Sequence, residues 1–171
     1  MMLRRIRSGS LRILNFVLVA AVAVLVVDVL LGVVSRYLWG KQVQWSEELA
    51  TVLLVWVSFL GIAAAFEARA HLGLDFLAGK FAPGAKRRAA LFGHVMSIAF
   101  TIAGFLIGGG ELVRRAMVNL NILPALQVSD VVLYLPLPVS GVFILIYEIS
   151  NFAEDWRRPA AAWQEETEVS R

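Results

Sequence analysis

Four long apolar stretches with almost no charged residues constrain this chain more than any other feature. They cover residues 11–35, 45–66, 89–110 and 131–149, and most of the 16 basic and 13 acidic side chains lie between or beyond them. About 20 apolar residues cross a bilayer core, so each stretch is long enough to span one. With 59% apolar and 17% charged residues, the composition is that of a membrane protein. We therefore predict an all-α integral membrane protein with four transmembrane helices.

The expected organisation is a single membrane domain at 11–150, with a basic N-terminus at 1–10 and a polar tail at 151–171. Arg4, Arg5 and Arg7 followed by an apolar run also fit a signal peptide with an Ala21-Val22-Ala23 cleavage pattern. The apolar run continues through Val34, which favours an uncleaved anchor over a signal peptide.

Lysine and arginine are distributed unequally between the two sides of such a bundle. Twelve lie in the N-terminal segment, the second connection and the tail, whereas four lie in the first and third connections. The positive-inside rule then places both termini in the cytoplasm of a multi-pass protein, which for a bacterial chain means the inner membrane.

The second connection has a pattern of its own. His71, Leu74, Leu77 and Phe81 recur at helical spacing, whereas Asp75 falls elsewhere. This pattern predicts a short amphipathic helix at 68–81, lying on the cytoplasmic surface of the membrane. After a turn at Pro83, Lys86, Arg87 and Arg88 are placed to meet lipid phosphates.

Asp28 is the carboxylate that lies deepest in a predicted span, and a charge at that depth is costly unless it is paired. Gly32 and Ser35 share its helix face, which would allow another helix to approach closely. We expect Asp28 to form a hydrogen bond across a helix interface, and a proton or ion site is the alternative.

The second span begins with Trp45, Ser46, Glu47 and Glu48. We expect Ser46 to cap the helix, the two carboxylates to favour its positive end, and Trp45 to lie at the membrane interface. The helix has an aromatic side and a small-residue side, which consist respectively of Trp45, Val52, Trp56, Phe59 and Ala63, and of Glu47, Leu54, Ser58, Gly61 and Ala65. The simplest expectation is lipid against the first and a packed helix against the second; a docking edge for a partner protein is the sharper hypothesis.

The third span carries a stripe of small residues at Gly93, Ser97, Thr101, Gly104 and Gly108. Two such stripes and Asp28 in a bundle of four helices favour a packing surface for another chain. The fourth span contains Pro136 and Pro138, which predict a kinked helix whose freed carbonyls are satisfied by a packed neighbour.

Several classes of function lack support in the sequence. There is no cysteine, and the only histidines, His71 and His94, are predicted at different depths, so neither a metal site, a haem nor another cofactor is expected. Catalytic motifs are absent, so we expect no enzyme. The basic residues flank apolar spans, which argues against nucleic-acid binding. A membrane anchor of an oxidoreductase would need cofactor ligands that two histidines alone would have to supply.

An ordered set of motifs gives the chain a family resemblance. It comprises Val34-Ser35-Arg36-Tyr37, Gly40, Trp45-Ser46-Glu47-Glu48-Leu49, Trp56, Phe59-Leu60-Gly61, His71-Leu72, Asp75, Pro83, Arg87-Arg88, Tyr134, Pro138 and Gly141. Together these resemble the small membrane subunit, of the DctQ type, of tripartite ATP-independent periplasmic (TRAP) transporters. The likeness covers about residues 11–149, and the segment 123–128 departs from the family pattern.

The resemblance implies a three-part secondary transporter. A binding protein outside the cytoplasm would capture an organic acid, such as a dicarboxylate or sugar acid, and a large membrane subunit would import it, driven by a sodium gradient. The small subunit would be a scaffold, and we expect its partner contacts among Asp28, Gly32, Arg36, Trp45, Glu47, Glu48, Trp56, Ser58 and Gly61, with His71, Asp75, Arg87 and Arg88 in the cytoplasmic interfacial segment. The alternative is a self-contained, proton-coupled exporter that uses Asp28.

Overall fold

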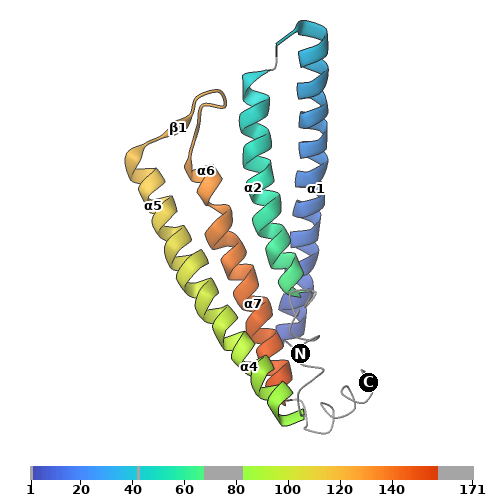
Figure 1. Ribbon diagram of the computed structural model, residues 1–171, viewed down its shortest axis with the longest axis vertical. Helices are drawn as coiled ribbons and strands as arrows, with labels where there is room; N and C mark the ends of the chain where they lie inside the picture. The colour runs from blue at the N-terminus through green and yellow to red at the C-terminus, as the bar shows by residue number, and fades with distance from the viewer. Residues whose placement is uncertain (1, 42, 68–82, 158–171) are drawn as a thin grey trace.

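The computed structural model describes residues 2–41, 43–67 and 83–157, which form long helices and one small hairpin (Figure 1). Helix α1 is Met2–Trp39 and α2 is Gln44–Glu67. A long third rod consists of α4 (Pro83–Phe100), the π-helix η1 (Thr101–Gly108) and α5 (Gly109–Asn119). Strands β1 (Ile122–Leu123) and β2 (Val128–Ser129) pair antiparallel, and α6 (Val131–Tyr134) and α7 (Pro136–Arg157) complete the order.

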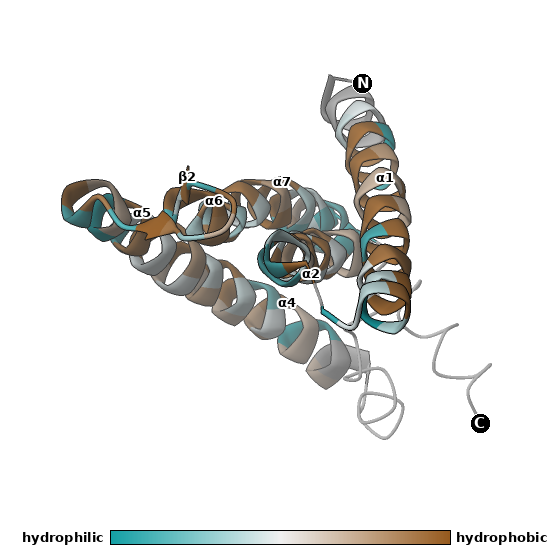
Figure 2. Ribbon diagram, turned by 90° about the horizontal axis from the view of Figure 1, so that it is seen from above, coloured by the Kyte–Doolittle hydropathy of each residue, from teal (hydrophilic) through white to brown (hydrophobic). Residues whose placement is uncertain are grey.

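Four helical segments of the described part are long and apolar enough to cross a membrane. They are Gly9–Trp39, Gln44–Glu67, Arg87–Asn119 and Val131–Arg157, which confirms the predicted number of spanning helices. Large apolar side chains point outward from them; Phe16 and Val19 on α1, for example, are 75% and 69% exposed. Seen from above, α1 is apolar over most of its surface (Figure 2). Such surfaces are stable in lipid rather than in water.

The helices are arranged in a row, with α2 between α1 and α7, and with the third rod on the far side of α7 (Figure 1). On α1 the buried and half-buried residues recur every three or four positions, at Leu14, Leu18, Ala21, Leu25, Asp28, Gly32 and Ser35. This spacing keeps one seam of α1 against α2 over most of its length. The central cluster joins α1, α2 and α7 through Leu14, Leu60, Ala63, Ile144 and Tyr147.

The third rod differs from the prediction in two ways. It continues beyond residue 110 to Asn119, because the charges there pair with one another: Glu111 accepts bonds from Arg114 at 2.7 Å and from Arg115 at 2.9 Å. It also contains eight π-helical residues, which break the expected continuous small-residue stripe. Thr101 is 1% exposed, whereas Gly104 on the same predicted stripe is exposed.

Two glycines allow the third rod and α7 to approach closely. A Cβ atom on Gly141 would lie 2.8 Å from the Phe105 Cβ, and one on Gly109 would lie 2.8 Å from the Leu137 Cβ. Real Cβ atoms do not tolerate such distances, so both positions require glycine at this helix crossing.

The fourth span is interrupted at Leu135, between α6 and α7, and Pro136 begins α7. The predicted interruption is therefore present, but near the start of the span. Because proline has no N–H, the carbonyl of Val132 four residues earlier loses its helical donor. The indole N–H of Trp56 donates to that carbonyl at 3.0 Å, so a packed neighbour satisfies the freed group, as expected.

The short hairpin was not predicted from the sequence. It occupies the segment 123–128 that departs from the family pattern, and lies at the same end as the α1–α2 connection (Figure 1). The predicted interfacial helix at 68–81 lies outside the described residues, as do His71 and Asp75.

Candidate functional site

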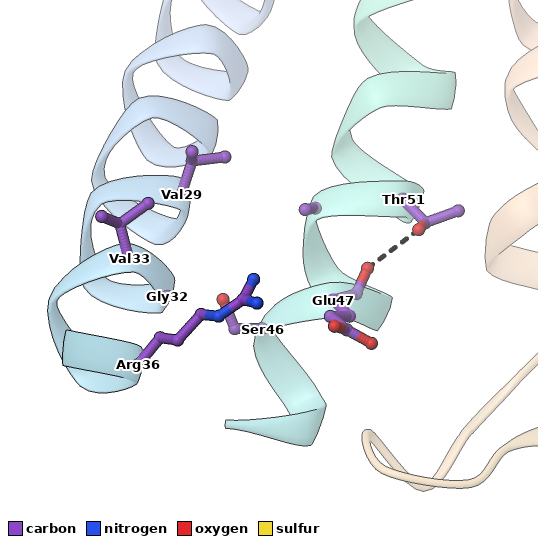
Figure 3. Close-up of a pocket in the computed structure, with 8 residues that line it drawn as sticks. Val29, Gly32, Val33, Arg36, Ser46, Glu47 and Thr51 are labelled. Carbon is purple, nitrogen blue, oxygen red and sulfur yellow. Dashed lines mark hydrogen bonds between the residues drawn. The ribbon is translucent and has the colours of Figure 1, made fainter. Parts of the chain in front are cut away.

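The first candidate site is a pocket of about 470 Å³ between α1 and α2, near the connection that joins them. Arg36 extends from the last turns of α1 towards the first turn of α2, where Ser46 and Glu47 lie (Figure 3). The remaining lining residues are Val29, Gly32, Val33, Ala50 and Thr51. The pocket therefore has charged residues at the end next to the α1–α2 connection and an apolar wall along the rest.

Asp28 lies next to Val29 in the seam between the same two helices. It is 3% exposed, and neither carboxylate oxygen has a hydrogen-bond partner within the described residues. A bond across this helix interface does form, but at the backbone: the Ser46 hydroxyl donates to the Asp28 carbonyl at 3.3 Å. Within the described residues the Asp28 side chain makes no such bond, so its bond to a helix of another chain stays a prediction.

The same bond corrects the prediction that Ser46 caps α2. The helix begins at Gln44, two residues earlier, so Ser46 is already inside it. Its hydroxyl ties α2 to α1 rather than closing the helix end, and Gly32 and Ser35 are buried against α2 beside it.

Glu48 holds the hairpin against α2. Its carboxylate accepts bonds from the backbone N–H of Ala125 at 3.0 Å and from that of Leu126 at 2.9 Å. Hydrogen bonds to a charged acceptor are among the stronger ones in proteins. Sequence analysis predicted a role for Glu48 at the helix end and in partner contacts but not this one, because its bonding partners lie 77 and 78 residues further along the chain.

The simplest expectation for α2 was lipid on its aromatic side and a packed helix on its small-residue side. Within the described chain the two sides have the reverse surroundings. On the aromatic side, Val52 and Ala63 are buried, and Trp56 and Phe59 are partly buried against the rest of the chain; Trp45 is 42% exposed. The expectation that lipid covers this side was therefore wrong for its middle. On the small-residue side, Glu47, Leu54 and Ser58 are exposed, as is the neighbouring Thr51, and a Cβ on Gly61 would meet no atom of the described chain within 4 Å, whereas Ala65 is half-buried. We call Glu47, Thr51, Leu54, Ser58 and Gly61 the open face of α2.

A buried group of ionisable side chains joins α4 to α7. The Nδ1 of His94 lies 2.9 Å from Glu148 Oε1, and its Nε2 lies 3.1 Å from Asp155 Oδ2. All three residues are at most 4% exposed. Both ring nitrogens donate only when the imidazole is protonated, so an imidazolium between two carboxylates is the form that satisfies both contacts. Sequence reasoning considered His94 only as a haem ligand and missed this cluster.

Arg87 and Arg88 lie in the first turns of α4, at the same end of the bundle as the end of α7. Arg87 Nη2 donates to the Trp156 carbonyl at 3.1 Å, and its guanidinium carbon lies 5.9 Å from the centre of the Trp156 ring. Arg87 therefore stabilises the C-terminal end of α7, where a positive charge is favourable.

Comparison with known proteins places this chain in a family. Residues 24–158 match the family described as tripartite ATP-independent periplasmic transporters, DctQ component. The chain belongs to the DctQ family. As a component of a transporter, a DctQ protein is not an enzyme.

Similar proteins agree with this assignment. The sialic acid TRAP transporter small permease protein SiaQ of Vibrio cholerae is 26% identical over 150 residues, which cover 88% of this chain and 83% of SiaQ. Two TRAP transporter small permease proteins of Haemophilus influenzae are 22% and 24% identical over 143 and 144 residues. These matches cover 84% of this chain and 87% and 86% of the two relatives. This DctQ chain is therefore a multi-pass membrane subunit of a TRAP transporter.

Proposed function

We propose that this DctQ subunit is the fixed scaffold of a sodium-gradient-driven importer of organic acids in a bacterial inner membrane. Its partners are a large membrane subunit, which carries the substrate, and an extracytoplasmic binding protein, which delivers it. The sialic acid in the name of the Vibrio cholerae relative is consistent with an organic acid as the class of substrate.

The open face of α2 is the observation that supports this proposal best. Its two hydroxyl groups are satisfied locally, because the Thr51 hydroxyl donates to the Glu47 carbonyl at 2.8 Å and the Ser58 hydroxyl donates to the Leu54 carbonyl at 2.7 Å. Small residues without a close neighbour among the described residues allow the backbone of another helix to approach, which is how helices associate in membranes. We assign the part of this face formed by Leu54, Ser58 and Gly61 to the large subunit. Glu48 and Trp56 make contacts within the chain, and their role as subunit contacts stays a prediction.

Replacing Gly61 by leucine tests this assignment. The added side chain meets no atom of the described chain near its Cβ, so the variant should fold. It should nevertheless hold a partner helix away and reduce co-purification of the large subunit about tenfold, since overpacking costs roughly 1–3 kcal/mol.

Gly110→Leu is the matched control, because a Cβ at Gly110 also meets nothing within 4 Å but lies on α5. It should leave the complex intact. Equal recovery of the large subunit with Gly61→Leu and with the unaltered chain would show that the open face of α2 is not the contact.

The alternative of a self-contained exporter depends on Asp28, and its one favourable observation is that this carboxylate is buried and has no partner within the described residues. Substrate sites at the midplane are usually built from pairs of interrupted helices facing each other. In the described chain the fourth span is broken near one end, and Asp28 lies on the unbroken α1. We therefore expect no transport by this chain alone.

Proteoliposomes provide the measurement. With this chain alone they should show neither sodium-dependent uptake of organic acids nor proton-coupled efflux, and uptake should require the large subunit and the binding protein. Saturable transport by the chain alone that Asp28→Asn abolishes would replace the scaffold with the exporter.

A further inference from the structure

The residues that flank the pocket between α1 and α2 are typical of the depth of lipid headgroups. Aromatic residues with large exposed surfaces flank it along the chain, with Tyr37 at 85%, Trp39 at 73% and Trp45 at 42% exposure. Tryptophan and tyrosine gather at the membrane–water boundary, where their polar atoms meet the headgroups. Val29, at the other end of the pocket, is seven residues from Arg36, or about 10 Å deeper along the helix.

Opposite charges stand on the two walls of this pocket. Arg36 comes from α1 and Glu47 from α2, and both are exposed (Figure 3). Within the described part of the chain, no ion pair joins them. A pocket of about 470 Å³ thus has a separate cation and anion at one end. A ligand that carries one charge of each sign, a short distance apart, complements both.

The hydroxyl groups of the pocket are already engaged. The Ser46 hydroxyl donates to the Asp28 backbone carbonyl, and the Thr51 hydroxyl donates to the Glu47 backbone carbonyl, each through its single proton. Among the side chains that line the pocket, Arg36 is therefore the available strong donor for an anionic group. Glu47 is the available charged acceptor for an ammonium.

We propose that this pocket binds a zwitterionic phospholipid, with the phosphate on Arg36, the ammonium on Glu47 and an acyl chain along Val29 and Val33. The two valines are 48% and 47% exposed on the side of α1 next to the pocket, which provides an apolar wall for the chain. Phosphatidylethanolamine has the required charges. An anionic lipid such as phosphatidylglycerol lacks the ammonium, and Glu47 would repel it. The lipid would fill the outer part of the seam between α1 and α2.

The experiment is a titration of the purified full-length chain with each of these two lipids, followed by native mass spectrometry. Arg36→Gln should reduce the retention of both lipids about three- to tenfold, as expected for one charge-assisted contact at a partly exposed site. Glu47→Gln should reduce the retention of phosphatidylethanolamine by a similar factor and leave that of phosphatidylglycerol unchanged or higher. This dependence on the headgroup distinguishes a specific lipid-binding site from non-specific binding of lipid.

Lys41→Gln is the matched control, because Lys41 is an exposed cation at the same end of the bundle and does not line the pocket. This variant should change the retention of neither lipid. Ala50→Trp would place an indole ring in the apolar part of the pocket and should reduce the retention of both lipids. This variant keeps the proposal testable if a charge variant fails to fold.

The proposal fails if Glu47→Gln leaves the ratio of the two lipids unchanged, or if Lys41→Gln has the effect of Arg36→Gln. It also fails if lipid retention is unaltered while co-purification of the large subunit is lost, because that result would assign the pocket to a protein partner.

Discussion

At the scale of single residues, the bond from Trp56 to the Val132 carbonyl is the contact with the clearest cause. It replaces the donor that Pro136 lacks. Trp56→Phe keeps an aromatic ring but removes the N–H, and should lower the free energy of unfolding by about 1–2 kcal/mol, because a carbonyl is left without a partner. Thermal unfolding in mild detergent measures the loss.

A double-mutant cycle separates this bond from packing. Pro136→Ala returns a backbone N–H four residues after Val132, so Trp56→Phe should cost less in that background, with a coupling of at least about 0.5 kcal/mol. Trp45→Phe is the control on an exposed ring. Strictly additive effects of Trp56→Phe and Pro136→Ala would mean that the indole is held by packing alone.

The residues also show where sequence reasoning succeeds. It identified Asp28 as buried, Pro136 as a point of interruption and the need for a neighbour to satisfy the freed carbonyl, because each follows from local chemistry. It missed the partners of Glu48 and His94, because these lie 77 and 54 residues away along the chain. No periodicity within one helix reports which other helix will face it.

At the scale of elements, the cluster of His94, Glu148 and Asp155 fastens α4 to α7. His94→Leu removes the donor between two buried carboxylates and should destabilise the protein by about 3–5 kcal/mol. The measurement is the temperature at which the detergent-solubilised chain aggregates, with the exposed Phe92→Leu on the same helix as control.

A second variant distinguishes charge from packing in this cluster. If the carboxylates drive the loss, adding Glu148→Gln to His94→Leu should recover part of it, because one buried negative charge is then removed. A double variant that is less stable than His94→Leu alone would contradict this explanation.

The π-helical segment η1 explains why the third span was the least well predicted element. A helical wheel drawn at 3.6 residues per turn assumes that faces stay aligned along the rod. Hydrogen bonds from i to i+5 in Thr101–Gly108 shift the register, so Thr101 is buried while Gly104 is exposed.

At the scale of the whole molecule, the arrangement makes the orientation in the membrane testable. The start of α1, the start of α4 and the end of α7 lie at one end of the bundle (Figure 1). Since the chain has no cysteine, single cysteines report cleanly. Those at Ser8, Ala85 and Ser170 should be protected from an impermeant maleimide in intact cells, whereas those at Gln42 and Asn121 should react.

Permeabilised cells provide the control, in which all five positions should label. Labelling of Ala85 from outside intact cells would overturn the proposed orientation with both termini in the cytoplasm.

The position of α7 has a consequence for biosynthesis. This helix touches α1, α2 and every segment of the third rod, and it carries Glu148 and Asp155. Yet it is the last of the described helices to leave the ribosome, so a nascent chain that has inserted its first three spans holds Trp56 and His94 in lipid without the contacts that α7 provides. α1 and α2 can already pair at that stage, because their contacts are local in sequence. Completion of the last 27 residues of the described chain, Val131–Arg157, is then the step that converts an intermediate vulnerable to membrane proteases into a finished bundle.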